Sequence, residues 1–302
     1  MTTDPSFRCS TAGLERADSI AGSASTVRSF LLIENPGPWG VDAVRDSRLP
    51  APVKAGIRAA AARANVRPLL IRRYHRRAPR TGFRVYAARA GLVDSWLQTA
   101  VLDGPEDLLD LDLEALGAGR SPGLVPTEET LVLVCTHGKH DACCAEKGRP
   151  VAAALAEAYP EETWEVSHIG GDRFAGNALV LPYGLYLGRL EPESAVVAAA
   201  DVLGGRLPLD VLRGRSCLPM AVQAAEIALF RHLGETAMAA VRVLGHRRDG
   251  ELTTVDLAAA ADRWTVSVRT TLGDEVLLTC RALRPNPLPH HQVVAVDRVG
   301  AR

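Results

Sequence analysis

The stretch Thr130-Leu-Val-Leu-Val-Cys135-Thr-His-Gly-Lys-His-Asp-Ala-Cys143-Cys144 decides the fold of this chain. It begins with a short run of aliphatic residues, as in a buried strand, and passes directly into a loop rich in thiols and imidazoles. A second polar loop, Ser167-His168-Ile-Gly-Gly-Asp172, follows further along the chain. Thiolates and imidazoles are the ligand types that suit iron–sulfur clusters and zinc. The two loops therefore predict a metal or redox site, provided that the fold brings them together.

The residues around these loops predict a strand–helix–strand unit that closes with a hairpin and a helix. A strand, a helix and a second strand form a parallel crossover, in which the carboxyl ends of both strands lie on the same edge of the sheet. We therefore expect the two loops to meet at that edge. The expected elements are strand 130–134, helix 150–159, strand 163–168, hairpin strands 177–181 and 185–190, and helix 194–203.

The same order of elements occurs earlier in the chain. Its expected elements are strand 30–34, helix 53–65, strands 67–72, 83–88 and 95–102, and helix 105–117. This order is that of a minimal thioredoxin-like unit, so the predicted fold class is α/β, with two tandem thioredoxin-like units in which helices flank a mixed sheet. Pro36-Gly-Pro-Trp-Gly40 replaces the cysteine loop in the first unit, which we therefore expect to be a scaffold or docking half without ligands.

The last third of the chain predicts a small α+β region with an antiparallel sheet. Its expected elements are helix 220–233, strands 239–244, 252–257, 264–271 and 275–280, an irregular tail near 284–291 and a last strand at 293–296. Residues 117–127 are rich in Gly, Pro and Ser and predict a linker between the first two units. The expected division is 1–122, 123–215 and 216–302.

Composition excludes several classes of protein. The 302 residues carry 35 basic and 35 acidic side chains, which argues against a dedicated nucleic-acid binder. No apolar run approaches the roughly 18 residues of a membrane span, and no secretory signal is evident. We therefore expect a cytoplasmic location, where thiols stay reduced and clustered cysteines favour metal or redox chemistry. Cys9, Cys217 and Cys280 are scattered singles, and for the last two we expect a packing role.

Four segments carry a resemblance to a known family: residues 30–40, 135–144 and 168–177, and the stretch Arg213-Gly-Arg-Ser-Cys217. Over residues 7–235 the chain resembles the sucrase/ferredoxin-like family. Members look like thioredoxin-like ferredoxins that hold a [2Fe–2S] cluster through two cysteines spaced as Cys135 and Cys144 and two histidines spaced as residues 168 and 172. The resemblance implies Cys135, Cys144 and His168 as ligands of such a cluster.

Residue 172 departs from that pattern because it is Asp. Three alternatives remain at this point: Asp172 binds iron through oxygen, Cys143 takes its place, or the cluster is absent. We favour Asp172 for its spacing. Arg173 could compete by pairing with Asp172. His137 and His140 are expected either in the outer shell of the site or in a solvated loop.

Two further motifs have both a structural and a functional interpretation. Gly170-Gly171 predicts positive φ or a close backbone approach near the site. Arg72-Arg-Tyr-His-Arg-Arg77, with Arg80, is the strongest charge run. It is either a solvated strand end or a docking surface for an acidic redox partner.

The function predicted from these features is electron transfer by a protein with one [2Fe–2S] cluster. The partner would be a reductase or acceptor protein of unknown identity, and the oligomeric state is left open. A thiol-redox enzyme on a thioredoxin-like scaffold is the enzymatic alternative, against which the missing Cys-x-x-Cys spacing argues. A structural zinc module is a third possibility. We find no convincing pair of carboxylates for glycoside hydrolysis.

Overall fold

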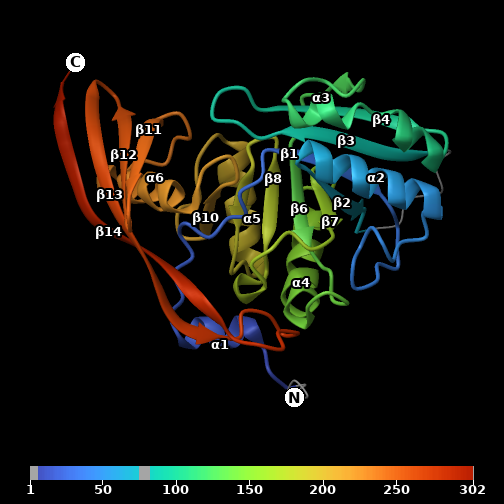
Figure 1. Ribbon diagram of the computed structural model, residues 1–302, viewed down its shortest axis with the longest axis horizontal. Coiled ribbons are helices and arrows are strands. Elements are labelled where there is room, and N and C mark those ends of the chain that lie inside the picture. Colours follow the sequence, from blue (N-terminus) through green and yellow to red (C-terminus); the bar gives the residue numbers. More distant parts are fainter. Residues whose placement is uncertain (1–5, 75–81, 302) are drawn as a thin grey trace.

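The computed structural model describes residues 6–74 and 82–301. In these residues ten strands form one mixed sheet in the order β10-β9-β8-β6-β7-β2-β1-β3-β4-β5, and four further strands form an antiparallel sheet at the C-terminal end (Figure 1). The predicted fold class is confirmed. None of the described helices is long and apolar enough to cross a membrane.

The first thioredoxin-like unit contributes one half of the large sheet. Strand β1 pairs in parallel with β2 and antiparallel with β3, which pairs with β4. The elements are β1 (Ser29–Glu34), α2 (Ala51–Ala64), β2 (Val66–Arg72), β3 (Phe83–Arg89), β4 (Trp96–Leu102), a 3-10 helix (Pro105–Asp110), α3 (Leu113–Gly117) and β5 (Val125–Pro126). The single helix expected at 105–117 was wrong: Asp112 accepts a hydrogen bond from the Ala115 amide, which starts a new helix there.

The second unit repeats this arrangement. Strand β6 pairs in parallel with β7 and antiparallel with β8, and β8 pairs with β9. The elements are β6 (Leu131–Cys135), α4 (Ala142–Ala158), β7 (Thr163–Val166), a 3-10 helix η2 (Asp172–Phe174), β8 (Ala178–Leu181), β9 (Leu185–Leu187), α5 (Pro192–Leu203) and β10 (Leu212–Arg215). The two units share one sheet because their second strands, β2 and β7, pair antiparallel at Ile71–Val166 and Arg72–Glu165.

The start of helix α4 corrects the prediction. A helix was expected from Pro150, since proline is favoured in a first helical turn, but α4 begins at Ala142 and Pro150 lies inside it. Asp141 is the N-cap, and its carboxylate accepts a hydrogen bond from the Cys143 amide at 2.9 Å. Cys143 and Cys144 therefore occupy the first helical turn and not a loop.

The C-terminal region is built on α6 (Met220–Leu233), as predicted. Its sheet consists of β11 (Val241–Asp249), β12 (Leu252–Ala259), β13 (Asp262–Val276) and β14 (Asn286–Ala301). The prediction of two strands at 264–280 and of an irregular tail was wrong, because β13 and β14 are single long strands. The prolines near the start of β14 are tolerated because it is an edge strand.

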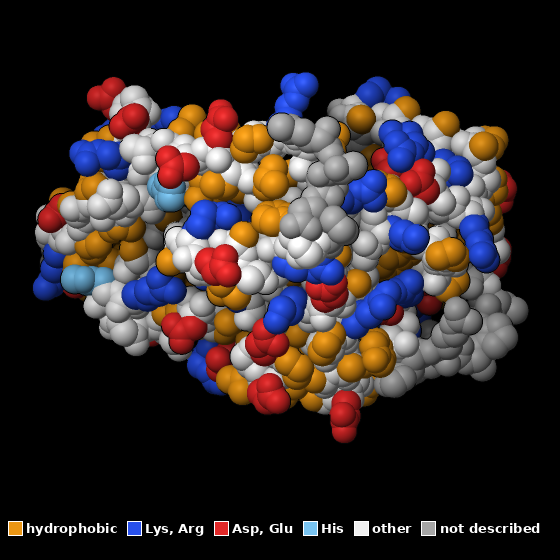
Figure 2. Space-filling model, turned by 90° about the horizontal axis from the view of Figure 1, so that it is seen from below, with side chains coloured by type: hydrophobic (Ala, Val, Ile, Leu, Met, Phe, Trp, Pro, Cys, Tyr) orange, Lys and Arg blue, Asp and Glu red, His pale blue; other side chains and the backbone are white. Residues whose placement is uncertain are grey.

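A helix that was not predicted, α1 (Cys9–Glu15), lies beside the far end of this long hairpin (Figure 1). The hairpin extends from the small sheet past α5 and ends near α1 and the start of α4. Apolar residues of α4, α5, α6 and the small sheet form one continuous buried cluster, so the C-terminal region packs directly on the second unit. On the face seen in Figure 2, acidic and basic side chains are interspersed, in keeping with the zero net charge.

Candidate metal centre

Cys135 and Cys144 are positioned by the close contact between strand β6 and helix α4. Cys135 is the last residue of β6, and Cys144 lies in the first turn of α4; both side chains are about 1% exposed. A Cβ added at Gly148 would collide with the carbonyl oxygen of Cys135. Glycine at this position therefore lets the helix approach the strand end, which brings the two thiols together.

The loop after β7 supplies His168 and Asp172. Gly170 and Gly171 have φ values of +95° and +82°, as predicted, and both belong to the left-handed region that glycine tolerates. The buried Arg213 on β10 holds this loop by donating from Nη1 to the carbonyl oxygen of Gly170 at 2.8 Å and to Asn177 Oδ1 at 2.9 Å. Asn177 Nδ2 donates in turn to the carbonyl oxygen of Gly171 at 2.8 Å.

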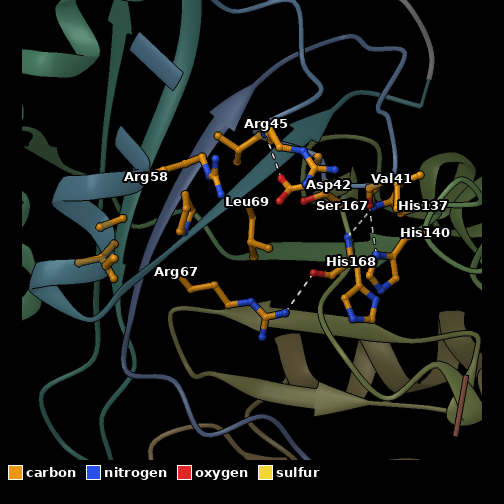
Figure 3. A pocket seen from close by; sticks show the side chains of 16 residues that line it. Val41, Asp42, Arg45, Arg58, Arg67, Leu69, His137, His140, Ser167 and His168 are labelled. Carbon is orange, nitrogen blue, oxygen red and sulfur yellow. Dashed lines mark hydrogen bonds between the residues drawn. The ribbon is translucent and has the colours of Figure 1, made fainter. Parts of the chain in front are cut away.

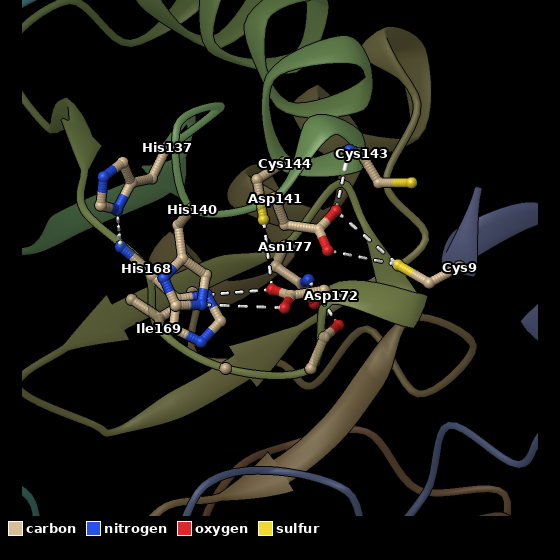
Figure 4. Close-up of polar contacts among 12 residues, drawn as sticks. Cys9, His137, His140, Asp141, Cys143, Cys144, His168, Ile169, Asp172 and Asn177 are labelled. Atoms are coloured by element: carbon tan, nitrogen blue, oxygen red, sulfur yellow. Dashed lines mark hydrogen bonds and ion pairs between the residues drawn. The ribbon is translucent and has the colours of Figure 1, made fainter. Parts of the chain in front are cut away.

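The four residues expected to be ligands lie together. Potential ligand atoms of Cys135, Cys144 and His168 lie within 4.8 Å of one another, as do those of His140, His168 and Asp172. The Cys144 thiol donates to Asp172 Oδ1 at 3.3 Å, and His168 Nδ1 lies 2.9 Å from the same oxygen (Figure 4). The topological argument that the two loops meet at one sheet edge is thus confirmed.

The electrostatics of the metal-free site favour the charged forms of Cys135, His168 and Asp172. Burial by itself would lower the pKa of His168, but contacts with Asp172 and Cys135 raise it to about 9. Burial would raise the pKa of Asp172, and His168 and His140 outweigh that effect and lower it. Contact with the Cys144 thiol, helped by His168, lowers the pKa of Cys135. Without a metal, a thiolate, an imidazolium and a carboxylate are therefore gathered in one buried place, beside the Cys144 thiol, whose pKa is raised by its contact with Cys135.

The donor set suits a bound metal group. His168 Nδ1 is buried and makes no well-directed hydrogen bond, so its 2.9 Å approach to Asp172 is an ion-pair contact only. A buried polar atom without a hydrogen-bond partner is uncommon in a folded protein. Two thiols, an imidazole and a carboxylate gathered around this place fit an iron–sulfur cluster or a zinc ion.

The two other histidines of the loop differ in role. His137 uses both ring nitrogens on backbone: Nε2 lies 2.6 Å from the carbonyl oxygen of Gly40, and Nδ1 accepts from the His168 amide at 3.2 Å. It therefore fixes the loops and has no nitrogen left for a metal. The His140 ring stacks on His168 with centroids 3.7 Å apart, and its Nε2 lies 4.0 Å from Asp172 Oδ2.

His140 is thus a potential ligand that the family pattern did not indicate. The sequence holds a weak signal for it, because His140 lies between Cys135 and Cys144 in the same stretch. Arg173 does not compete for Asp172: its Nε lies 3.3 Å from Asp18 Oδ2.

Cys143 belongs to a different group from Cys144. Figure 4 shows the two neighbouring side chains pointing to different sides of the helix start. Cys143 lies with Cys9, Cys280 and Asp141, whose potential ligand atoms are within 4.8 Å of one another. Cys280 packs against Cys9 and Cys143, in keeping with its expected packing role, and the tertiary structure thus gathers cysteines that are scattered singles in the sequence. In contrast, Cys217 is buried outside the groups of potential metal ligands found among the described residues.

A groove of about 620 Å³ between the two units leads to the site (Figure 3). His140 and His168 line it, with side chains 34% and 23% exposed, and Arg67 donates to the carbonyl oxygen of His168 at 3.0 Å. Three arginines line the groove as well: Arg45, Arg58 and Arg67.

The arginine run expected at a solvated strand end or docking surface is only partly described. Arg72 forms a bidentate pair with Glu165, at 2.8 and 3.0 Å. Arg73 donates to three backbone carbonyl groups of residues 160–163. These two side chains bind the neighbouring strand end and are partly exposed, whereas residues 75–81, with the rest of the run, lie outside the described residues.

Comparison with known proteins supports a family assignment. The family described as sucrase/ferredoxin-like matches residues 20–214. "Altered inheritance of mitochondria protein 32" of Saccharomyces cerevisiae strains YJM789 and RM11-1a is 30% identical over 96 residues, which cover 27% of this chain. The matched region spans 31% of the length of these relatives. No solved structure matches the chain.

Proposed function

Since the chain belongs to the sucrase/ferredoxin-like family, we propose that it is an electron-transfer protein whose second thioredoxin-like unit holds one [2Fe–2S] cluster. Cys135, Cys144, His168 and Asp172 would be its ligands. The observation that supports this most is the convergence of two thiols, an imidazole and a carboxylate from two separate segments of the chain: potential ligand atoms of Cys135, Cys144 and His168 lie within 4.8 Å of one another, and Asp172 contacts both Cys144 and His168. When bound, such a cluster supplies reversible one-electron transfer.

The residues of this chain would set the properties of the cluster. An anionic Asp172 ligand adds negative charge relative to a second imidazole, favours the ferric state and lowers the reduction potential. Centres with two histidine ligands span about −150 to +300 mV, so a potential below that of a two-histidine variant is expected. His137 fixes the His168 backbone, and the stacked His140 covers the His168 ring on the side of the groove.

Electrons would enter and leave through the groove between the units, where the site is closest to solvent. His140 and His168 are the partly exposed members of the site, and arginines line the same groove. Complementary charge accelerates encounter between proteins, so the redox partner would present an acidic surface here. The first unit contributes one wall of this groove. Its role would therefore be to form part of the docking surface for the redox partner.

The test is an absorption spectrum of anaerobically purified protein, with iron and labile sulfide measured on the same sample. Bands between about 300 and 600 nm that bleach with dithionite, with iron and sulfide nearly equal, support the proposal. A colourless, iron-free sample after anaerobic reconstitution refutes it. Zinc in place of iron at Cys135 and Cys144 would instead favour a structural site.

Variants identify the fourth ligand. Asp172→Ala should lose the cluster or change its spectrum, whereas His140→Ala should keep it if Asp172 is the ligand. Asp172→His restores a second imidazole and should raise the reduction potential. The control is Cys217→Ser, which removes a buried thiol outside the site and should leave iron content and potential unchanged. An unchanged spectrum in Asp172→Ala together with a loss in His140→Ala would assign the position to His140.

A further inference from the structure

A second group of thiols gathers on the other side of the start of α4. Cys9 comes from α1, Asp141 and Cys143 from the start of α4, and Cys280 from the connection between β13 and β14. The first three side chains are buried, and Cys280 is partly buried. Three segments that are far apart in the sequence thus place four potential ligands in one buried spot.

The distances within this group are those of a tetrahedral site. Cys280 Sγ lies 3.3 Å from Cys143 Sγ and 3.6 Å from Cys9 Sγ. Both carboxylate oxygens of Asp141 lie 3.7 Å from Cys9 Sγ. Zinc–sulfur bonds of about 2.3 Å in a tetrahedron separate the sulfurs by about 3.8 Å, and a zinc-bound oxygen lies about 3.5 Å from them. Little movement would therefore be needed to place one zinc ion between the four groups.

The carboxylate favours a cation over a hydrophobic packing role. Asp141 has no measurable exposure, and in the described part of the chain no cationic side chain forms an ion pair with it. A buried charge is costly unless it is paired or binds a metal. The amides of Cys143 and Cys280 donate to its two oxygens at 2.9 and 2.7 Å, which orients the carboxylate and leaves further lone pairs available.

Two of the sulfur atoms accept hydrogen bonds from neighbouring groups. Ser10 Oγ donates to Cys143 Sγ at 3.2 Å, and the Cys9 amide donates to Cys280 Sγ at 3.5 Å. Hydrogen bonds to the ligand atoms orient and tune metal ligands. A disulfide accounts less well for the group, because three thiols cannot all pair with one another and a disulfide has no need of the carboxylate.

We propose that Cys9, Cys143, Cys280 and Asp141 form a second metal site, which binds one zinc ion in tetrahedral geometry. Cys9 and Cys280 both lie outside residues 20–214, the part of the chain that matches the family. The effect of this site would be to join α1 and the β13–β14 hairpin to the first turn of α4. Because Cys144 lies in that same turn, zinc would also hold one thiol of the Cys135 site in place.

The decisive experiment measures zinc in full-length protein purified without chelators. Elemental analysis should find about one zinc per chain, and absorption at the zinc K-edge should show about three sulfur neighbours and one oxygen neighbour. This edge is not affected by iron, and a zinc ion at Cys135, Cys144 and His168 would instead show about two sulfur neighbours, so the spectrum distinguishes the two sites. It also requires no variant, so it holds even where a cysteine substitution prevents folding.

Variants then assign the ligands. The double variant C9S/C280S should lose its zinc, whereas the control C217S should keep its zinc. The proposal is overturned if the protein contains no zinc even after incubation with zinc and gel filtration. It is also overturned if C9S/C280S retains the full zinc content, or if alkylation and mass spectrometry of anaerobic protein find a disulfide within the group.

Discussion

Substitution of Arg213 by methionine tests whether this buried cation holds the ligand loop. Arg213 is 1% exposed, and burial lowers its pKa to about 10. It donates to the carbonyl oxygens of Gly170 and Ser23, to Asn177 Oδ1 and to Ser23 Oγ. Its guanidinium also lies 5.3 Å from the centre of the Phe174 ring. Methionine fills much of the same volume but donates no hydrogen bond.

The expected loss of stability follows from the oxygen atoms that no longer receive a hydrogen bond from Arg213. Three strong acceptors lose their donor, and each buried acceptor without a partner costs roughly 1–3 kcal/mol, which gives roughly 3–9 kcal/mol in total. Part of this loss is offset, because methionine removes the desolvation penalty of the buried guanidinium, which is several kcal/mol. We expect Arg213→Met to lower the free energy of unfolding by about 3 kcal/mol.

The assay is urea unfolding of the metal-free protein, followed by circular dichroism. Arg206→Met is the matched control, because Arg206 pairs with Asp201 on the surface with its side chain 53% exposed and should change stability by about 0.5 kcal/mol or less. In metal-loaded protein, Arg213→Met should also release iron faster. If Arg213→Met lowers the free energy of unfolding by less than about 1 kcal/mol, an effect close to that of the control, Arg213 does not anchor the loop.

Three further predictions concern the helix contact, pH and metal removal. Gly148→Ala should cost about 1–3 kcal/mol and lower the iron content, because its Cβ would collide with the β6 backbone, whereas Gly245→Ala has open space and should change little in the same urea assay. In metal-free protein the pKa of His168 is raised to about 9, so its stabilising effect is complete below about pH 6.5 and is lost as the pH rises through 9. Urea midpoints measured from pH 6 to 10 should fall over that window, and His168→Gln should flatten the decline. Removal of zinc by a strong chelator should accelerate proteolysis near Cys280 and lower Tm, and equal cleavage with and without zinc would contradict the second site.

Much of the fold could be predicted from local patterns. Apolar runs located β1 to β4 and β6 to β9, but not β5 and β10. The repeated order of elements indicated two thioredoxin-like units, which the pairing of β1 with β2 and of β6 with β7 confirms. The errors lie where a local rule competed with tertiary contacts. Pro150 suggested a helix start, but the Asp141 cap begins α4 eight residues earlier. The prolines near the start of β14 suggested an irregular tail, but an edge strand accepts them.

By itself, the sequence determined the family and the meeting of the two loops, because parallel crossovers place strand ends on one edge of a sheet. It also placed Cys135, Cys144, His168 and Asp172 at that meeting point. Only the tertiary structure decided where Cys143 belongs, because neighbouring residues of a helical turn point in different directions. It alone brought Cys9 and Cys280 together, since a contact between residues 271 positions apart depends on how α1 and the long β13–β14 hairpin pack against α4.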